Sequence, residues 1–157
     1  MTRYAFLTTW LLETSRERAW EVLQEPLCWP EWWRGVVRVS ELDGGDGRRV
    51  GSRYRIAWRS RVPYELEFDF TVNRVDEPCC MEGEATGELE GTGRWRLFEQ
   101  NGVTAVLYEW EVSTTKRWMN LVAPLARPVF EHNHDVVMRW GGEGLARRLG
   151  VKLLAAG

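Results

Sequence analysis

The sequence contains little cysteine and histidine, with three Cys and two His in 157 residues. Cys28, Cys79 and Cys80 form neither a disulfide framework nor the spacing of a zinc site. In a strand, the adjacent Cys79 and Cys80 would point to opposite faces, which argues against a shared redox or metal role. We therefore expect structural thiols, no metal site and a reducing, cytoplasmic location.

Long apolar runs and a strong net charge are also missing. No stretch approaches the ~18 apolar residues that a membrane-spanning helix needs, and residues 1–4 lack the character of a signal region. Lys and Arg total 21 against 23 Asp and Glu, a formal net charge of −2. This balance gives no electrostatic reason to expect nucleic acid or an acidic membrane surface as a partner, and we expect no stable membrane insertion.

The short motifs of several enzyme classes are absent. Gly44-Gly45-Asp46-Gly47 predicts a turn, but it lacks the Lys and the helix of a phosphate-binding loop. Neither a nucleophile elbow nor an HExxH helix is present. We expect no cofactor.

Tryptophan, in contrast, is abundant, with ten residues spread over the whole length. Its side chain supplies a large, stiff, amphipathic surface. The ten indoles could fill a core, line a pocket for a flat or apolar ligand, or do both.

The pattern over residues 4–115 predicts short strands, with two short helices after the first strand. Thr14 and Glu17 have the spacing of a capping box, and Pro26 suits the first turn of a second helix that ends near Gly35. Apolar and polar residues then alternate, and Asn101-Gly102 predicts a hairpin turn. The expected strands cover residues 4–13, 37–40, 53–59, 64–72, 79–90, 92–99 and 106–112. Short turns between them require antiparallel neighbours.

Charged residues alternate with the apolar ones in the strands at 53–59 and 64–72. One strand has a basic face made of Arg53, Arg55, Arg59 and Arg61. The next has an acidic face made of Glu65, Glu67 and Asp69. We expect cross-strand ion pairs on the solvent side of this hairpin.

Helical periodicity returns near the end, where residues 125–149 are long enough for roughly six turns. On a helical wheel Met138 and Gly142 lie mostly opposite an apolar arc. The arc comprises Val122, Ala126, Val129, Phe130, Val136, Val137, Trp140 and Gly144. We expect a single domain over residues 1–157 of the α+β class. A seven-stranded antiparallel curved sheet would wrap around this helix and enclose a mostly apolar pocket, with the two short helices closing one end.

Three stretches are similar to one known superfamily: residues 15–23, the Trp-containing segment 28–33, and residues 133–138 with 144–149 of the last helix. Together with the order of elements, they resemble the START-like helix-grip superfamily (SRPBCC), in particular its polyketide cyclase/dehydrase-like branch. The resemblance implies the helix-grip fold. It also implies binding of lipids, sterols, hormones or polyketides, with catalysis in only some members.

Asn133 lies at the centre of the apolar arc, where an unpaired amide would cost roughly 1–3 kcal/mol. It either anchors a ligand carbonyl or hydroxyl, or bonds a strand backbone or a water. His132 and His134 flank it at about 100° on either side. Either could be a general base, or one is exposed and the other makes a surface hydrogen bond. The two side chains diverge too far to share a metal.

Aromatic residues supply the other candidates. A Tyr on the apolar side of a strand could hold a ligand oxygen or donate a proton, or it could be a core residue whose hydroxyl reaches the rim. We expect Trp32 and Trp33 at the pocket entrance. The predicted ligand-binding set is Asn133, Tyr54, Trp58, Tyr64, Phe68, Trp95, Tyr108, Trp110, Val129, Val136 and Trp140. The catalytic candidates are His132, His134, Tyr64 and Tyr108.

Three functions remain open from the sequence. The first is binding of a hydrophobic or aromatic, lipid- or polyketide-like small molecule between sheet and helix. The second is a polyketide cyclase/dehydrase-type enzyme that uses general acid–base residues in the same cavity. The third is a stress-related or protein-interaction adaptor whose Trp residues form an exposed apolar patch. In each case the chain would be a monomer or a homodimer.

Overall fold

The computed structural model describes residues 2–45, 49–62 and 64–157, so Asp46 and Gly47 of the expected turn lie outside the described residues. The fold is α+β, with one curved antiparallel sheet of eight strands in the order β2-β3-β4-β5-β6-β7-β1-β8. The strands are β1 (Arg3–Leu12), β2 (Val36–Gly44), β3 (Ser52–Arg59), β4 (Glu65–Asp76), β5 (Cys80–Gly87), β6 (Leu89–Gln100), β7 (Val103–Thr114) and β8 (Leu153–Ala156). The helices are α1 (Arg16–Leu23), a one-turn 3-10 helix (Pro26–Cys28), α2 (Trp29–Trp32), α3 (Arg117–Leu121) and α4 (Ala123–Leu149).

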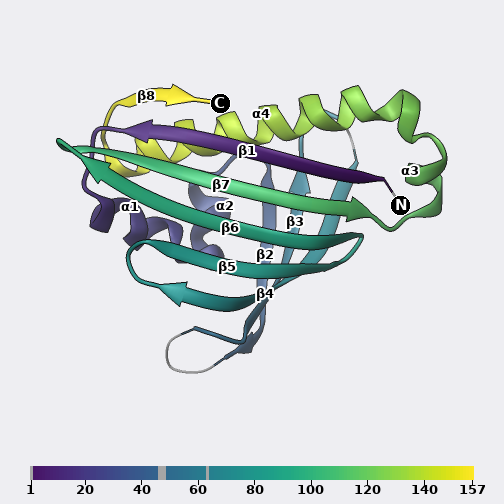
Figure 1. The fold of residues 1–157 in the computed structure, drawn as a ribbon, viewed down its shortest axis with the longest axis horizontal. Helices are drawn as coiled ribbons and strands as arrows, with labels where there is room; N and C mark the ends of the chain where they lie inside the picture. The colour runs from purple at the N-terminus through teal and green to yellow at the C-terminus, as the bar shows by residue number, and fades with distance from the viewer. Residues whose placement is uncertain (1, 46–48, 63) are drawn as a thin grey trace.

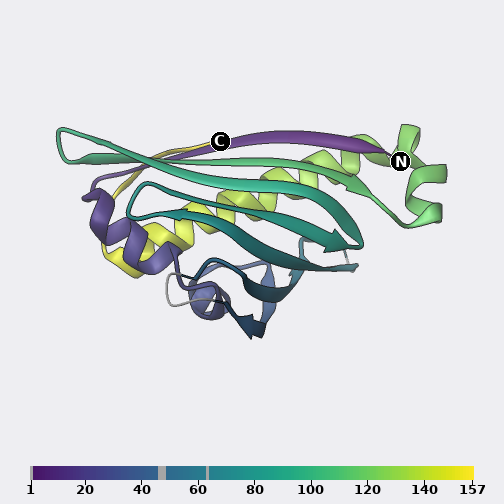
Figure 2. The same ribbon diagram turned by 60° about the horizontal axis from the view of Figure 1, so that its bottom comes forward.

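The long helix α4 runs along the concave face of the sheet (Figures 1 and 2). Helices α1 and α2 lie near its C-terminal end, and α3 lies at the opposite end of the molecule. The sheet and α4 therefore enclose an elongated interior with two distinct ends.

The prediction of seven strands was wrong, because β8 adds an eighth. Helix α4 ends at Gly150, whose positive φ of 67° lets the chain reverse. Residues after it return beside β1, where Trp10 pairs with Ala156. A four-residue strand is too short to show a clear alternation in the sequence.

Two other boundaries differ from the prediction. The N-cap of α1 is Ser15, whose side chain accepts a hydrogen bond from the Arg18 backbone N–H at 3.3 Å, so the expected cap at Thr14 was wrong. Leu89 begins β6 and pairs with Thr114 of β7, although it was assigned to the preceding strand. The prediction treated Gly91 as a break between two strands, but Gly91 lies within β6.

The expected cross-strand ion pairs are confirmed for Arg53 and Arg55, but Arg59 and Arg61 form none with a described residue. Arg55 Nε lies 2.8 Å from one Asp69 oxygen, and Arg53 Nη2 lies 2.9 Å from the other. These two guanidinium groups hold the pKa of Asp69 below its usual value. Because strand neighbours alternate, the pairs lie on the face opposite the core residues Phe68 and Phe70.

The interior near α1 and α2 is filled by indole rings, and we call this the packed end. Trp10, Trp29, Trp33 and Trp95 form a connected cluster there, with contacting ring centroids 5.4 to 6.0 Å apart. The Trp33 N–H also donates to the Val137 carbonyl of α4 at 2.8 Å. Trp32 and Trp33 are buried here, so the expectation that they border a pocket entrance was wrong.

Glycines allow α4 to approach the rings of the packed end. A Cβ added at Gly141 would lie 2.6 Å from the Trp33 ring, and one at Gly144 would lie 1.8 Å from the Trp32 carbonyl oxygen. Neither position has room for a methyl group. The short sequence Trp140-Gly141-Gly142-Glu143-Gly144 therefore determines how closely helix and indoles pack.

The prediction of which α4 residues face the interior was only partly correct. Met138 and Gly142, predicted to lie opposite the arc, are buried, because α1, α2 and β1 enclose the C-terminal half of α4 from several sides. Val122 and Val129 are exposed, because the start of α4 projects past the end of β7 (Figure 1). Across the described ranges, no helix combines the length and apolar character needed to cross a membrane.

Candidate functional site

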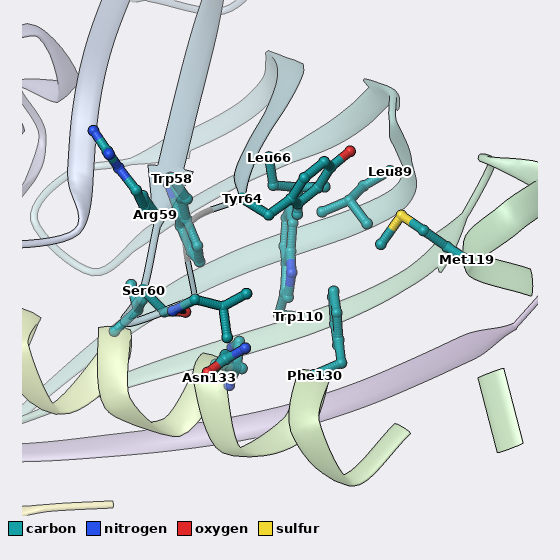
Figure 3. Close-up of a pocket in the computed structure, with 13 residues that line it drawn as sticks. Trp58, Arg59, Ser60, Tyr64, Leu66, Leu89, Trp110, Met119, Phe130 and Asn133 are labelled. Atoms are coloured by element: carbon teal, nitrogen blue, oxygen red, sulfur yellow. Dashed lines mark hydrogen bonds between the residues drawn. The ribbon is translucent and has the colours of Figure 1, made fainter. Parts of the chain in front are cut away.

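A cavity of about 100 Å³ lies at the other end of the interior, which we call the hollow end. It is bounded by the β3–β4 connection, the adjoining ends of β4, β6 and β7, helix α3 and the first half of α4 (Figure 3). The lining residues are Trp58, Arg59, Ser60, Val62, Tyr64, Leu66, Leu89, Trp110, Met119, Phe130, Asn133, His134 and Val137.

Apolar side chains make most of the cavity wall. The rings of Trp58 and Trp110 stack with centroids 6.2 Å apart and an interplanar angle of 25°. Figure 3 shows Phe130 and Asn133 on α4 facing these rings, with Met119 reaching in from the side of α3. The wall therefore favours an apolar or aromatic occupant.

Several polar atoms in this wall lack a partner. The indole N–H of Trp58 and both ring nitrogens of His134 are buried without a hydrogen bond to any described residue. The Tyr64 hydroxyl also forms no hydrogen bond of ordinary geometry, although the Lys116 ammonium lies 5.3 Å from the centroid of its ring. More than about 90% of buried polar groups in proteins have a partner. Their presence around one small cavity is the main chemical feature of the site.

His134 has the most unusual environment in the site. Its ring stacks on Phe6, with centroids 3.8 Å apart, and only 7% of the residue is exposed. Burial lowers the pKa of His134 from 6.5 to about 4, because the imidazolium would lose its hydration. The Asp135 carboxylate opposes this shift, but it is exposed and lies 3.7 Å from Nδ1, beyond hydrogen-bond distance. The imidazole is therefore neutral near pH 7.

The other two polar candidates of α4, Asn133 and His132, differ in their exposure and in their position relative to the cavity. Asn133 is half-buried and lines the cavity beside His134. His132 is exposed, and it is not among the lining residues. The expectation that both histidines lie at or near the surface was wrong for His134, because Phe6 of β1 covers the side of α4 on which it lies.

The structure brings Asn133, His134, Trp58, Tyr64 and Trp110 together at the cavity. It places the remaining ligand-binding candidates elsewhere. Five are core residues outside the cavity wall: Tyr54, Phe68, Trp95, Tyr108 and Val136. Tyr108 stacks on Trp95 at 4.1 Å, and burial raises its pKa well above the usual value, which does not suit a proton donor.

Two further candidates lie on the outside of the molecule. Val129 is 52% exposed. Trp140 is half-buried beneath Arg34, whose guanidinium carbon lies 4.3 Å from the ring centroid. Both belong to the predicted arc, but the arc is longer than the part of α4 that faces the cavity.

The sequence analysis missed Met119 and Leu89 as lining residues. Met119 lies in α3, for which no helix was predicted, although residues 116–121 contain good helix formers and no Gly or Pro. Leu89 was assigned to a different strand. Among the residues that the structure describes, no cluster of His, Cys, Asp and Glu has the arrangement of a metal site.

Comparison with known proteins gives matches only among solved structures. No protein-family model and no curated protein matches the sequence. TTHA0849 from Thermus thermophilus superposes with a TM-score of 0.75 at 13% identity, over 92% of this chain and 99% of that one. The Zhui aromatase/cyclase from Streptomyces sp. R1128 gives a TM-score of 0.73 at 14% identity, over 94% and 96%.

A third match is to a longer protein. The di-domain aromatase/cyclase BexL from the BE-7585A biosynthetic pathway gives a TM-score of 0.67 at 15% identity. The match covers 91% of this chain but only 50% of BexL, so the chain spans about half of that protein. At these identities the likeness establishes the fold alone. The chain has the helix-grip fold, as the resemblance implied.

Proposed function

We propose that residues 1–157 act as one ligand-binding domain, which holds a small hydrophobic or aromatic molecule in the cavity beside Asn133 and His134. The observation that carries this proposal is an apolar wall interrupted by unpartnered polar atoms of Trp58, Tyr64 and His134. Small-molecule sites typically combine mostly apolar walls with a few convergent polar groups. A bound ligand would supply the partners that these atoms lack within the protein.

The cavity size limits what can bind. Its volume of about 100 Å³ is below the roughly 300–1,000 Å³ of pockets that enclose drug-sized ligands. We therefore propose that one ring or one polar head occupies the cavity. The remainder of a lipid- or polyketide-like chain would leave between the β3–β4 connection and α3, where Val62 and Met119 border the cavity.

The state of His134 restricts the polar group of the ligand. A neutral imidazole offers one donor and one acceptor, and the indole of Trp58 offers a donor. A hydroxyl or a carbonyl satisfies these groups without bringing a charge into an apolar cavity. A carboxylate head fits less well. Arg59, the one cation among the described lining residues, is exposed at the edge, and Lys116 beside Tyr64 is already paired with Glu88.

A polyketide cyclase/dehydrase-type enzyme is the second candidate function. It is supported by the fold shared with the Zhui and BexL aromatase/cyclases and by the position of His134 at the cavity. A pKa of about 4 makes this imidazole a poor general base near neutral pH, since catalytic bases work best with a pKa near the operating pH. Binding without turnover is therefore the preferred proposal.

The test begins with native mass spectrometry of the purified protein, in which a retained ligand appears as added mass. Calorimetric titration with 4-ethylphenol, a one-ring probe with one hydroxyl, follows. We expect binding that Tyr64→Phe weakens by about 5- to 10-fold, because a ligand hydrogen bond is lost. The matched variant Tyr54→Phe removes a hydroxyl from a buried Tyr outside the cavity and should leave the affinity unchanged.

Two results would contradict the binding proposal. One is the absence of both a retained ligand and probe binding. The other is equal weakening by Tyr64→Phe and Tyr54→Phe. The enzyme would be favoured if His134→Gln retained binding of a linear poly-β-ketone but abolished its conversion to a cyclised product.

A further inference from the structure

Exposed apolar side chains gather on α3 and the first turns of α4, beside the mouth of the cavity. Leu121 and Leu125 are 83% and 85% exposed, and Trp118 and Val129 are each more than half exposed. Five of the twelve large apolar side chains that are exposed in the described residues fall between positions 118 and 129. Such concentration on one surface is unusual in a water-facing protein and marks an interaction site.

This segment is also locally basic, although the chain as a whole is not. Residues 112–130 contain Lys116, Arg117 and Arg127 but no Asp or Glu, whereas the whole chain has a net charge of −2. Lys116 is paired with Glu88 at 2.6 Å and Arg127 with Glu131 at 3.0 Å. Arg117 has no carboxylate partner within the described ranges.

The β3–β4 connection borders the cavity opposite Met119 of α3, with the Arg59 side chain directed away from α3 (Figure 3). Arg59 and Arg61 are exposed there, and neither forms an ion pair with a described residue. Val62, between this connection and the cavity, is 38% exposed. We name the exposed apolar residues of 118–129, Val62 and the cations Arg61 and Arg117 the mouth surface.

We propose that the mouth surface docks reversibly on an anionic lipid membrane. Exposed Trp and Leu side chains, accompanied by Arg and Lys, are the composition of segments that lie in the membrane interface. The charge decides between this occupant and a second copy of the chain. A face-to-face dimer would bring the same cations together, whereas anionic headgroups complement them.

Figures 1 and 2 show that α3 and the start of α4 project beyond the end of β7, so a flat surface can reach them without contacting the body of the sheet. Docking in this orientation places the cavity mouth against the lipid. An apolar ligand could then pass between membrane and cavity without crossing water. The docking itself requires no ligand, so it stands apart from the binding proposal.

The test is co-sedimentation of the ligand-free protein with vesicles. We expect binding to mixed phosphatidylcholine–phosphatidylglycerol vesicles that greatly exceeds binding to pure phosphatidylcholine and weakens as salt is added. Leu121→Ser/Leu125→Ser should reduce the partition coefficient by about 10-fold or more. Arg117→Gln should reduce it by about 5-fold at low salt.

The matched control is Leu7→Ser/Phe98→Ser, which removes two exposed apolar side chains from β1 and β6 and should leave partition within about 2-fold of the original. The proposal is overturned if the unaltered protein does not bind mixed vesicles, or if the control and Leu121→Ser/Leu125→Ser lose binding equally. A dimer in sedimentation velocity that Leu121→Ser/Leu125→Ser dissociates would also overturn it and identify a second copy as the occupant. Tyr64→Phe should retain vesicle binding, so failure of this proposal is distinct from failure of the cavity proposal.

Discussion

Both ends of the interior contain buried Trp side chains, but these are closely packed at the packed end and border a cavity at the hollow end. At the packed end the Trp33 indole N–H donates to Val137, and the ring contacts five other indoles. At the hollow end the Trp58 indole N–H has no partner among the described residues, and its ring borders the cavity. Burial alone does not separate these residues, since both are more than 90% buried.

The difference follows from what α4 presents to the sheet. Near its C-terminal end α4 presents Gly141 and Gly144, so large rings fill the space and the helix packs closely. Near its middle it presents Asn133 and His134, whose polar atoms cannot pack against apolar neighbours without cost. One helix thus stabilises the fold at one end and leaves space for a ligand at the other.

The largest expected effect comes from removing a ring at each end. Trp33→Ala should lower the free energy of unfolding by about 4 kcal/mol, because it leaves a cavity in a close-packed region. Trp58→Ala should cost only about 2 kcal/mol, since that ring already borders empty space and makes fewer contacts. Urea denaturation of both variants measures the difference. Equal losses would show that the two ends are packed alike.

A pH effect of roughly 2–3 kcal/mol should belong to the hollow end alone. His134 has a pKa of about 4 when folded and about 6.5 when unfolded, so the unfolded state binds more protons between these values. The stability is therefore complete above about pH 6.5 and is lost as the pH falls toward 4. Urea denaturation across this range measures the slope.

His134→Gln should flatten that slope. Asp69 and Glu109 also have pKa values lowered by neighbouring Arg residues, but their contributions are lost mainly as the pH falls through the usual carboxyl range and below it. A variant with an unchanged slope between pH 6.5 and 4.5 would assign the effect to other groups.

The smallest expected effect comes from placing apolar bulk at each end. Gly144→Ala should improve helix propensity by about 1 kcal/mol, but the clash with the Trp32 carbonyl should cost about 3, a net loss of about 2 kcal/mol. Asn133→Leu replaces an amide with a somewhat bulkier apolar group of the same branched shape at the hollow end, and it should change the stability by less than about 1 kcal/mol. Thermal denaturation compares them, and a larger loss for Asn133→Leu would contradict a hollow cavity.

Much of the fold could be predicted from the sequence because the strands alternate clearly. The ion pair of Arg55 with Asp69 followed from the register implied by the alternation, and the resemblance supplied the sheet wrapped around a helix. Strand β8 and helix α3 could not be found by the same means. Both are four or five residues long, and tertiary contacts define them more than local periodicity does.

The candidate site was harder to predict. A helical wheel or an alternating pattern shows on which face a side chain lies, but not how deeply it is buried. Asn133 was placed correctly on the inner side of α4, but the pattern could not show that Val129 lies beyond the sheet. Nor could it show that Phe6 covers His134. Which of several inward Tyr and Trp residues border empty space depends on side-chain volumes across strands, which a single sequence does not reveal.

Strand β1 lies between β7 and β8 in the finished sheet, although it is made first. Its partners in β7 follow more than 90 residues later, as the pairing of Leu12 with Thr104 shows. During synthesis both edges of β1 therefore remain unpaired until β7 and β8 are made, and its aromatic and aliphatic side chains are exposed to other chains. Pairing over such sequence distances folds slowly. The rate at which β7 emerges from the ribosome thus sets how long a nascent chain is prone to aggregate.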